Sequence, residues 1–415
     1  MQIKLNLTDK MTSKTSKNRL LQALMGLGPG IITAALVFGP SKMTITSKLG
    51  AEYGYSMLWV VVVAIFFMLI FTNMGARIGL SSSTSLLTHI RNKWGKSAGI
   101  IIGIGVFLVT TSFQAGNSIG VGIAIAEATG TKPWIWVLVF NILGMSLLFF
   151  RSFYKTLEKL MIALVGLMLI SFLTTLFLSK PSLSGIASGF MPSIPLGSTG
   201  LLIAFIASCF SIVGAFYQSY LIQENKKEGD DSNTQNRSFT GILILGLMSA
   251  VVIICAAAVL HPQGIKVNSA SEMSKALEPL FGTYAAQLFL AGLFGASFSS
   301  LVGNATVGGS LLGDALGFGN KLSAKAVRGF IALVMICGAS ISLIFGKLPL
   351  ELIIFAQSVT IFLVPFIGFA MYAIANDSKI MGKYINKPLS KIAGLIGLLL
   401  LSGLAIWNFY ELFIK

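Results

Sequence analysis

The chain has 415 residues, of which 55% are hydrophobic and only 11% are charged. Apolar runs of about 20 residues, each long enough to cross a hydrocarbon core, recur from end to end and exclude a soluble globular protein. The net charge of +16 would favour a nucleic-acid partner in a soluble protein, but here the basic residues gather in alternate loops, which is the pattern of membrane topology.

Residues 1–20 are polar and lack the apolar core of a signal peptide, so we expect an uncleaved cytoplasmic tail. With this tail inside, the cytoplasmic loops carry 21 of the 30 Lys and Arg residues and the opposite face carries six. This bias predicts a multi-pass protein of the plasma membrane with an extracellular C-terminus. The pattern predicts eleven spans, near residues 27–52, 56–80, 98–128, 133–150, 157–179, 199–223, 239–260, 283–313, 327–346, 350–375 and 389–412.

The first span is interrupted by Gly39-Pro40-Ser41-Lys42. A helix is interrupted inside a bilayer only where its freed backbone is buried in protein or lines a cavity, so this break is a candidate binding site. Lys42 could snorkel toward the interface. Its place at the start of a second half-helix, where free amides already carry positive partial charge, favours a lysine that faces the site.

Polar side chains also occur at depth in the third, sixth and eighth spans. Taken singly, each is explained by a hydrogen bond between helices or by close packing. Taken together, they predict a neutral, polar pathway. Its members lie at Gln114 and Asn117 in the third span, between Ser208 and Ser219 in the sixth, and at Ser297, Ser299, Ser300 and Asn304 in the eighth.

Groups that bind metals or carry protons are missing from the predicted spans. None of the fourteen acidic residues falls near the centre of a span, and we place both histidines, His89 and His261, in loops. The three cysteines lack metal-ligand spacing, and the sequence contains neither HExxH nor a nucleophile elbow. We therefore predict no metal site, no cofactor and no enzymatic activity.

The chain resembles the Nramp superfamily of metal-ion transporters along nearly its whole length. From Gly28-Pro29, the family's spacing to Asp-Pro-Gly-Asn reaches Gly39-Pro40-Ser41-Lys42 here, with glycine in place of the metal-binding aspartate. Ser211-Ile212-Val213 aligns with the family's Met-Pro-His. The stretch from Gln357 to Pro365 is similar to the motif of the tenth span, although a leucine replaces the second glutamine.

The resemblance implies an all-α polytopic membrane protein with eleven transmembrane helices. They would form two inverted five-helix repeats, in which helices 1 and 6 are broken, and one extra helix, as in amino-acid transporters of this architecture. The expected segments are the tail at 1–20, repeat 1 (spans 1–5) at 21–180, repeat 2 (spans 6–10) at 199–376 and the extra span at 388–415.

The exchange of acids for a lysine leads us to predict a secondary transporter of a small monovalent anion, with bicarbonate as the preferred substrate. The expected binding residues are Gly39, Ser41, Lys42, Ser211, Gly214, Gln218, Gln114 and Asn117. Ser299 and Ser300 form a possible sodium site, and coupling to sodium or protons stays open. The expected partners are this anion and the lipid bilayer, with no protein partner.

Three alternatives stay open. The protein could carry a neutral solute such as an amino acid, with Lys42 in place of a cation. It could carry manganese or magnesium, against which we weigh the repulsion from Lys42. It could also be a regulatory relative that does not transport.

Overall fold

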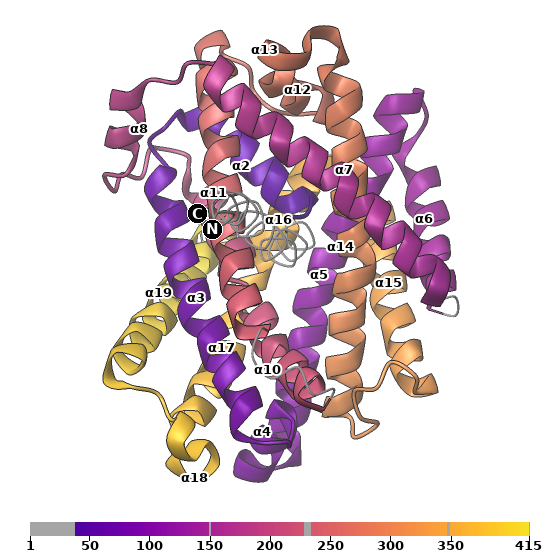
Figure 1. Cartoon of the computed structure of the whole chain (residues 1–415), viewed down its shortest axis with the longest axis vertical. Helices are drawn as coiled ribbons and strands as arrows, with labels where there is room; N and C mark the ends of the chain where they lie inside the picture. The colour runs from indigo at the N-terminus through magenta and orange to yellow at the C-terminus, as the bar shows by residue number, and fades with distance from the viewer. Residues whose placement is uncertain (1–37, 149–150, 228–233, 347–348, 415) are drawn as a thin grey trace, which may run out of the picture.

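The computed structural model describes residues 38–414 except 149–150, 228–233 and 347–348, and this part contains helices and turns but no strand. Figure 1 shows the long helices α3, α5 and α14 running along the long axis, while α7 crosses them at a slant. The helices are α2 (Pro40–Tyr53), α3 (Leu58–Ser81), α4 (Leu86–Trp94), α5 (Lys96–Thr129), α6 (Pro133–Leu147), α7 (Arg151–Leu178), α8 (Leu183–Gly189), α9 (Thr199–Phe210), α10 (Ile212–Lys227), α11 (Thr234–Val259), α12 (Ala270–Ser274), α13 (Glu278–Phe281), α14 (Ala285–Ala315), α15 (Lys325–Phe345), α16 (Pro349–Thr360), α17 (Val364–Ala375), α18 (Ser378–Met381) and α19 (Pro388–Phe413).

Seven helical segments of the described chain are long and apolar enough to cross a membrane, or nine if each of two bent pairs counts as one span. The prediction of an all-helical polytopic membrane protein is therefore confirmed. Part of the predicted first span, the tail 1–20 and Gly28-Pro29 lie outside the described residues. For this reason α2, with only 14 residues, does not count as a span by itself.

The predicted break in the sixth span is a one-residue interruption. Helix α9 ends at Phe210, Ser211 takes a left-handed conformation with φ +32°, and α10 begins at Ile212. The two helices together still form one continuous apolar segment, Thr199–Glu224. The interruption frees carbonyl groups in the last turn of α9, because a helix leaves its last carbonyls without intrahelical partners.

A second interruption, which the sequence analysis did not predict, separates α16 from α17. The two helices are bent by 41°. A three-residue turn at 361–363 joins them, and Pro365 lies in the first turn of α17. Backbone N–H groups in the first turn have no acceptor within the helix, so proline loses no hydrogen bond there. Its fixed φ also suits the start of a helix, which explains why α17 begins at this point.

Close helix contacts depend on small residues, as is common in membranes. Gly75 and Gly79 lie one turn apart on α3 and face the backbone of α10. A methyl group at Gly75 would lie 2.0 Å from the carbonyl oxygen of Ala215, and one at Gly79 would lie 2.5 Å from that of Ser219. Helix α3 therefore holds α10 at a distance that no side chain at these two positions would allow.

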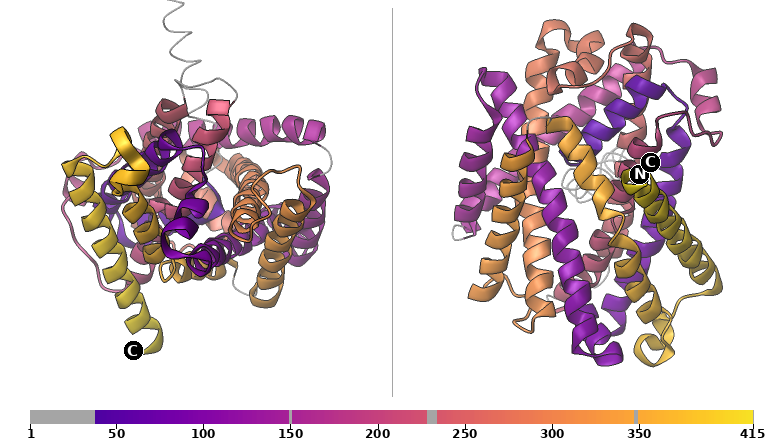
Figure 2. Two further views of the ribbon diagram at one scale, coloured as in Figure 1. Left: turned by 90° about the horizontal axis from the view of Figure 1, so that it is seen from below. Right: turned by 180° about the vertical axis from the view of Figure 1, so that it is seen from behind.

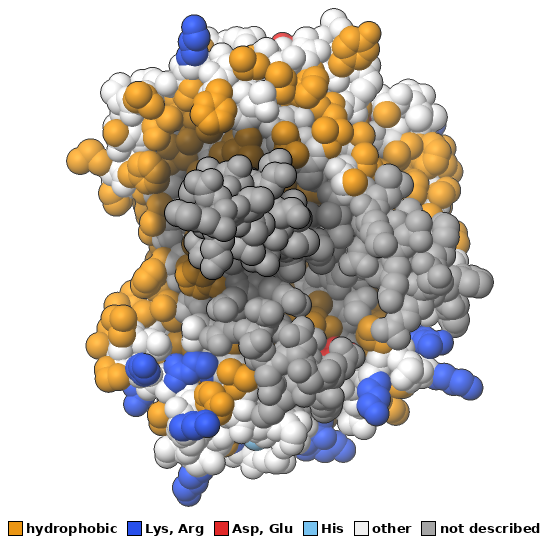
Figure 3. All heavy atoms as spheres, in the orientation of Figure 1, with side chains coloured by type: hydrophobic (Ala, Val, Ile, Leu, Met, Phe, Trp, Pro, Cys, Tyr) orange, Lys and Arg blue, Asp and Glu red, His pale blue; other side chains and the backbone are white. Residues whose placement is uncertain are grey.

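Charge is distributed unevenly between the two ends of the molecule. Figure 2 shows α19 along the periphery, and α18 with the start of α19 lies at the lower end, near α4. Figure 3 shows most Lys and Arg side chains of this face at that end, below a broad apolar belt. We call this the basic end; α8, α12 and α13 lie at the opposite end.

The contact between α3 and α10 is testable by adding one methyl group. We expect Gly75→Ala to lower the free energy of unfolding by about 2 kcal/mol or more, because the backbone of α10 cannot yield as a side chain would. Thermal unfolding of the purified protein measures this loss. The control is Gly403→Ala on α19, where the added methyl group meets nothing within 4 Å. Equal melting temperatures for the two variants would contradict this packing.

Candidate functional site

A cavity of about 810 Å³ lies where α2, α5, α9, α10, α14 and α16 meet. Its lining is mainly apolar and includes Phe113 and Tyr217, but polar groups gather around the start of α2. Cavities of this kind, apolar with a few convergent polar groups, are the usual form of a small-ligand site. The polar lining residues on which the following description rests are Ser41, Lys42, Asn117, Ser208, Ser300 and Gln357.

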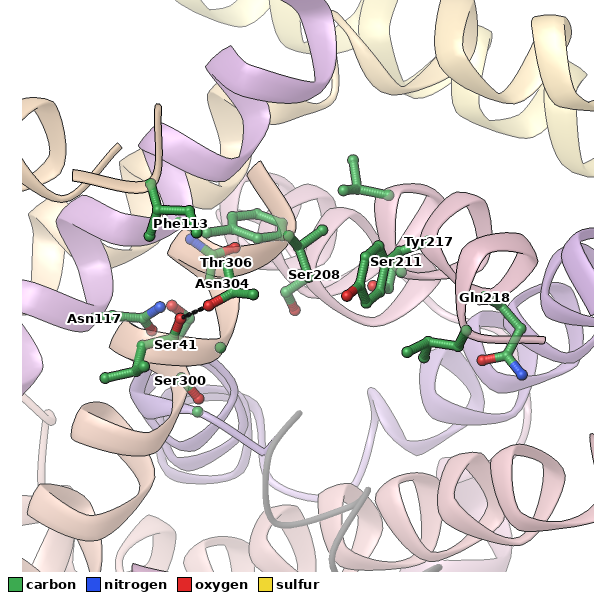
Figure 4. A pocket seen from close by; sticks show the side chains of 18 of the residues that line it. Ser41, Phe113, Asn117, Ser208, Ser211, Tyr217, Gln218, Ser300, Asn304 and Thr306 are labelled. Atoms are coloured by element: carbon green, nitrogen blue, oxygen red, sulfur yellow. Dashed lines mark hydrogen bonds between the residues drawn. The ribbon is translucent and has the colours of Figure 1, made fainter. Parts of the chain in front are cut away.

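Side chains from neighbouring helices lie close to the backbone at the start of α2. Gly39 is extended, Pro40 occupies the first turn, and the side chain of Ser41 accepts a hydrogen bond of 2.9 Å from Gln357 Nε2 of α16. A Cβ atom at Gly39 would lie 2.9 Å from Ser300 Oγ and 3.6 Å from Asn117 Oδ1. Figure 4 shows Ser41, Asn117 and Ser300 on the same side of the cavity. Neutral oxygen groups from α2, α5 and α14 therefore surround the first turn of α2.

Lys42 is only 4% exposed, and its Nζ donates a hydrogen bond of 3.0 Å to the carbonyl oxygen of Ser208. Ser208 lies in the last turn of α9, where carbonyls carry negative partial charge and lack intrahelical partners. The ammonium group thus sits against the negative end of α9. The carbonyl oxygen of Ser208 is thus placed to bind a cationic group, and in this structure it binds the ammonium group of Lys42.

The predicted residues of the sixth span lie farther along the same cavity. Ser211, Gly214 and Gln218 all line it, and Figure 4 draws Gln218 well apart from Ser41. Gln218 is 5% exposed, and its Nε2 has no hydrogen-bond partner among the described residues. Gln218 therefore lies outside the polar group around Gly39.

Two predicted residues do not line the cavity. Gln114 is fully buried and accepts a hydrogen bond of 3.1 Å from Asn304 Nδ2, which also donates to the carbonyl of Thr110. Ser299 is also buried away from the lining, whereas its neighbour Ser300 takes part in it. The structure brings the other predicted residues together around one cavity and leaves Gln114 as a link between α5 and α14.

The far end of α2 is also fixed. His261, which follows α11 in a short 3-10 turn, donates through Nδ1 to the carbonyl of Ala51 at 2.8 Å. Its ring also packs against Gly54, where an added Cβ would lie 3.3 Å from the imidazole. The sequence analysis placed His261 in a loop, and in the structure it ties the end of α11 to the end of α2.

The ends of α4, α10 and α14 are held together at the basic end. Tyr220 donates to Asp314 Oδ2 at 2.7 Å and accepts a hydrogen bond of 3.3 Å from the amide of Leu87. Arg91 donates to the carbonyls of Asp314 and Ala315. These contacts join α4, α10 and α14 at this end.

Sequence reasoning missed two groups of the site. Gln357 lay within the motif of the tenth span, and a glutamine in an apolar helix was the available signal. The Ser208 carbonyl had no signal, because it belongs to the backbone and becomes available only where α9 ends.

Comparison with known proteins identifies the family. The family model "Natural resistance-associated macrophage protein-like" (Nramp) matches residues 30–411. The chain belongs to the Nramp family. This is a family of transporters, so the prediction that the chain is not an enzyme is confirmed.

Named relatives and solved structures agree with this membership. The chain is 23% identical to a divalent metal cation transporter MntH of Deinococcus radiodurans, over 92% of this chain and 89% of the relative. It is 26% identical to MntH of Pectobacterium carotovorum, over 94% and 95% of the two chains. A crystal structure of the Eremococcus coleocola manganese transporter matches with a TM-score of 0.72 at 17% identity and covers 93% of this chain and 86% of that one. This last likeness shows a shared fold.

The predicted substrate and partner, a small monovalent anion and bicarbonate in particular, are wrong. The relatives that match along nearly the whole chain are named transporters of divalent metal cations, and the neutral-solute alternative gains no support from them either. The physical reason for the error lies in Lys42. The expectation requires its charge to face the substrate, whereas the ammonium group is buried against the Ser208 carbonyl.

The hydrogen bond between α16 and α2 provides a test of the site geometry. We expect Gln357→Leu to lower the free energy of unfolding by about 1–3 kcal/mol, because Ser41 stays buried and loses its donor. The same change in a Ser41→Ala background should cost less, since the partner is already gone. A double-mutant cycle on thermal unfolding measures this difference. Equal costs in both backgrounds would mean that the two side chains do not interact.

Proposed function

We propose that this protein carries a divalent metal cation across the membrane and that the cation binds in the cavity around the start of α2. The named activity of its relatives and the family membership support this proposal. The observation that carries it is the Ser208 carbonyl, which lies at the negative end of α9, faces the cavity region and already accepts a cationic group. Such a position attracts cations and repels anions.

The lining chemistry favours a hydrated, hard cation. Among the described residues that line the cavity, none is a carboxylate or an imidazole, and the polar side chains are hydroxyls, amides, Lys42 and Arg328. Within the same described part of the chain, no group of three His, Cys, Asp or Glu side chains could hold a metal ion. Magnesium loses its water shell reluctantly and binds oxygen ligands through water, so magnesium or manganese with most of its waters suits these donors.

Lys42 and the cargo compete for the same place. A divalent cation at about 4 Å from an ammonium group is repelled by about 8 kcal/mol at an effective dielectric constant of about 20. Lys42 therefore has to swing away from Ser208 or lose its proton before a cation approaches that carbonyl. The lysine holds the carbonyl while no cargo is bound, and the cargo replaces it in the loaded state.

Replacement of the lysine by a neutral side chain of similar length tests this competition. We expect Lys42→Met to bind magnesium and manganese at least about tenfold more tightly than the parent protein, because the repulsion is removed. Isothermal titration calorimetry of the purified protein measures the affinity.

Lys325→Met is the control for this titration, since it removes an equal charge from an exposed position at the start of α15. If neither the parent protein nor Lys42→Met gives saturable heat with either metal, the proposed cargo is wrong. If both lysine variants bind alike, Lys42 plays no part in the competition.

The proposal extends to the arrangement in the membrane. It includes eleven spans with broken helices 1 and 6, inverted repeats at 21–180 and 199–376, and an extra span at 388–415, with the basic end in the cytoplasm. The helices found at the predicted spans and the charge at one end of the molecule support this arrangement. Ser299 and Ser300 stay a proposed sodium site, of which only Ser300 lines the cavity.

Orientation is testable by labelling single cysteines in intact cells. After replacement of Cys209, Cys255 and Cys337 by alanine, a thiol reagent that cannot cross the membrane should label Thr283→Cys but not Asn320→Cys. Both positions are exposed, Thr283 in the turn before α14 and Asn320 in the loop after it. Permeabilised cells should show labelling at both sites. The reverse pattern in intact cells would invert the proposed orientation.

A further inference from the structure

The corner between α17 and α19 carries an unusual share of unbalanced positive charge. Between residues 352 and 410 the sequence contains four lysines, Lys379, Lys383, Lys387 and Lys391, and one acidic residue, Asp377. All four lysines are exposed. The described part of the chain contains two ion pairs, Lys48 with Glu52 and Lys93 with Asp377. The single carboxylate of the corner is thus already used by a lysine of α4.

Two hydrogen bonds hold the carboxylate of Asp377 in its ion pair with Lys93. The hydrogen bond from Lys93 lowers the pKa of the Asp377 carboxyl, against a smaller opposing effect of burial. Its other oxygen accepts the amide of Lys379 at 3.0 Å. The charges of Lys387 and Lys391 therefore have no carboxylate of the described chain to neutralise them.

The backbone of this corner is held in place from α3. Arg77 donates to the carbonyls of Tyr384 and Ile385, and its second terminal nitrogen donates to Asn386 Oδ1 at 3.2 Å. At the start of α19, the amide of Lys391 donates to the carbonyl of Lys387 at 3.0 Å. The two lysines thus stand one helical turn apart, on the same face of α19.

The same face of α19 continues from lysines into exposed apolar side chains. One turn and two turns beyond Lys391 lie Leu395 and Leu399, which are 49% and 64% exposed. Ile392, beside this row, is 59% exposed. In a membrane-spanning helix at the edge of the molecule, such side chains face acyl chains. Two ammonium groups followed along the helix by an apolar row match the phosphate and the acyl chains of an anionic phospholipid.

We propose that Lys387 and Lys391 form a binding site for the phosphate headgroup of an anionic phospholipid, whose acyl chains lie along Leu395 and Leu399. Lys383 stands nearby on the locked corner and adds to the local positive potential. A bound lipid would join α19 to the corner that Arg77 fixes against α3. The site is separate from the cavity and does not depend on the cargo.

The test compares phosphatidylglycerol with phosphatidylcholine on the purified protein. Native mass spectrometry measures the lipid retained, and thermal unfolding measures the stabilisation. We expect the parent protein to retain and be stabilised by phosphatidylglycerol. The double variant Lys387→Gln/Lys391→Gln should retain it about thirtyfold more weakly, because each lysine near an anionic lipid contributes about fivefold.

Two further variants make the result specific. Lys321→Gln/Lys325→Gln removes two exposed lysines with the same spacing at the start of α15 and should retain the lipid like the parent. Lys387→Arg/Lys391→Arg keeps the charge and should also retain it, which controls for misfolding. Equal losses in both glutamine variants, or full retention by Lys387→Gln/Lys391→Gln, would overturn the site. An equal stabilisation of the parent by free glycerol phosphate would overturn its assignment to a lipid.

Discussion

The hydrogen bond from Lys42 to the carbonyl of Ser208 is the contact around which the centre of this protein is arranged. A helix end inside a membrane leaves carbonyl groups without intrahelical partners, and each group left unsatisfied is costly. Here the first turn of α2 supplies an ammonium group to the last turn of α9. The Lys42 side chain thereby supplies a hydrogen bond to the end of α9 and joins α9 to α2. The neutral oxygen groups around Gly39 line the same cavity, so the proposed place for the cargo lies beside this helix end.

Much of the helical framework was predictable from the sequence, because an apolar segment in a bilayer can satisfy its backbone only within itself. The last span was expected near 389–412 and is α19, Pro388–Phe413. Gly39-Pro40 was expected to interrupt the first span. Helix α2 begins at Pro40, and the part of that span before residue 38 lies outside the described residues. The bend between α16 and α17 was missed, since Pro365 within an apolar run can start a new helix or merely kink the old one.

Most of the polar residues that line the cavity were predictable from the sequence, but the role of Lys42 among them was not. Polar residues at depth in three spans do converge on one cavity, because a bilayer leaves them few other places to lie. The role of Lys42 was not predictable, since its partner is a backbone carbonyl 166 residues away in the chain. A lysine that faces a substrate and a lysine that satisfies a helix end have the same sequence pattern.

The attachment of α2 at both ends has a mechanical consequence. This helix is about 21 Å long, and it is tied to α16 and α9 at Ser41 and Lys42 and to the end of α11 through His261. Along its length it packs closely on α11, where a methyl group at Gly50 would lie 2.3 Å from the carbonyl oxygen of Ile253. Helix α2 thus spans the distance between the surface at His261 and the cavity at Ser41 and Lys42, and it is bonded to a different neighbour at each end.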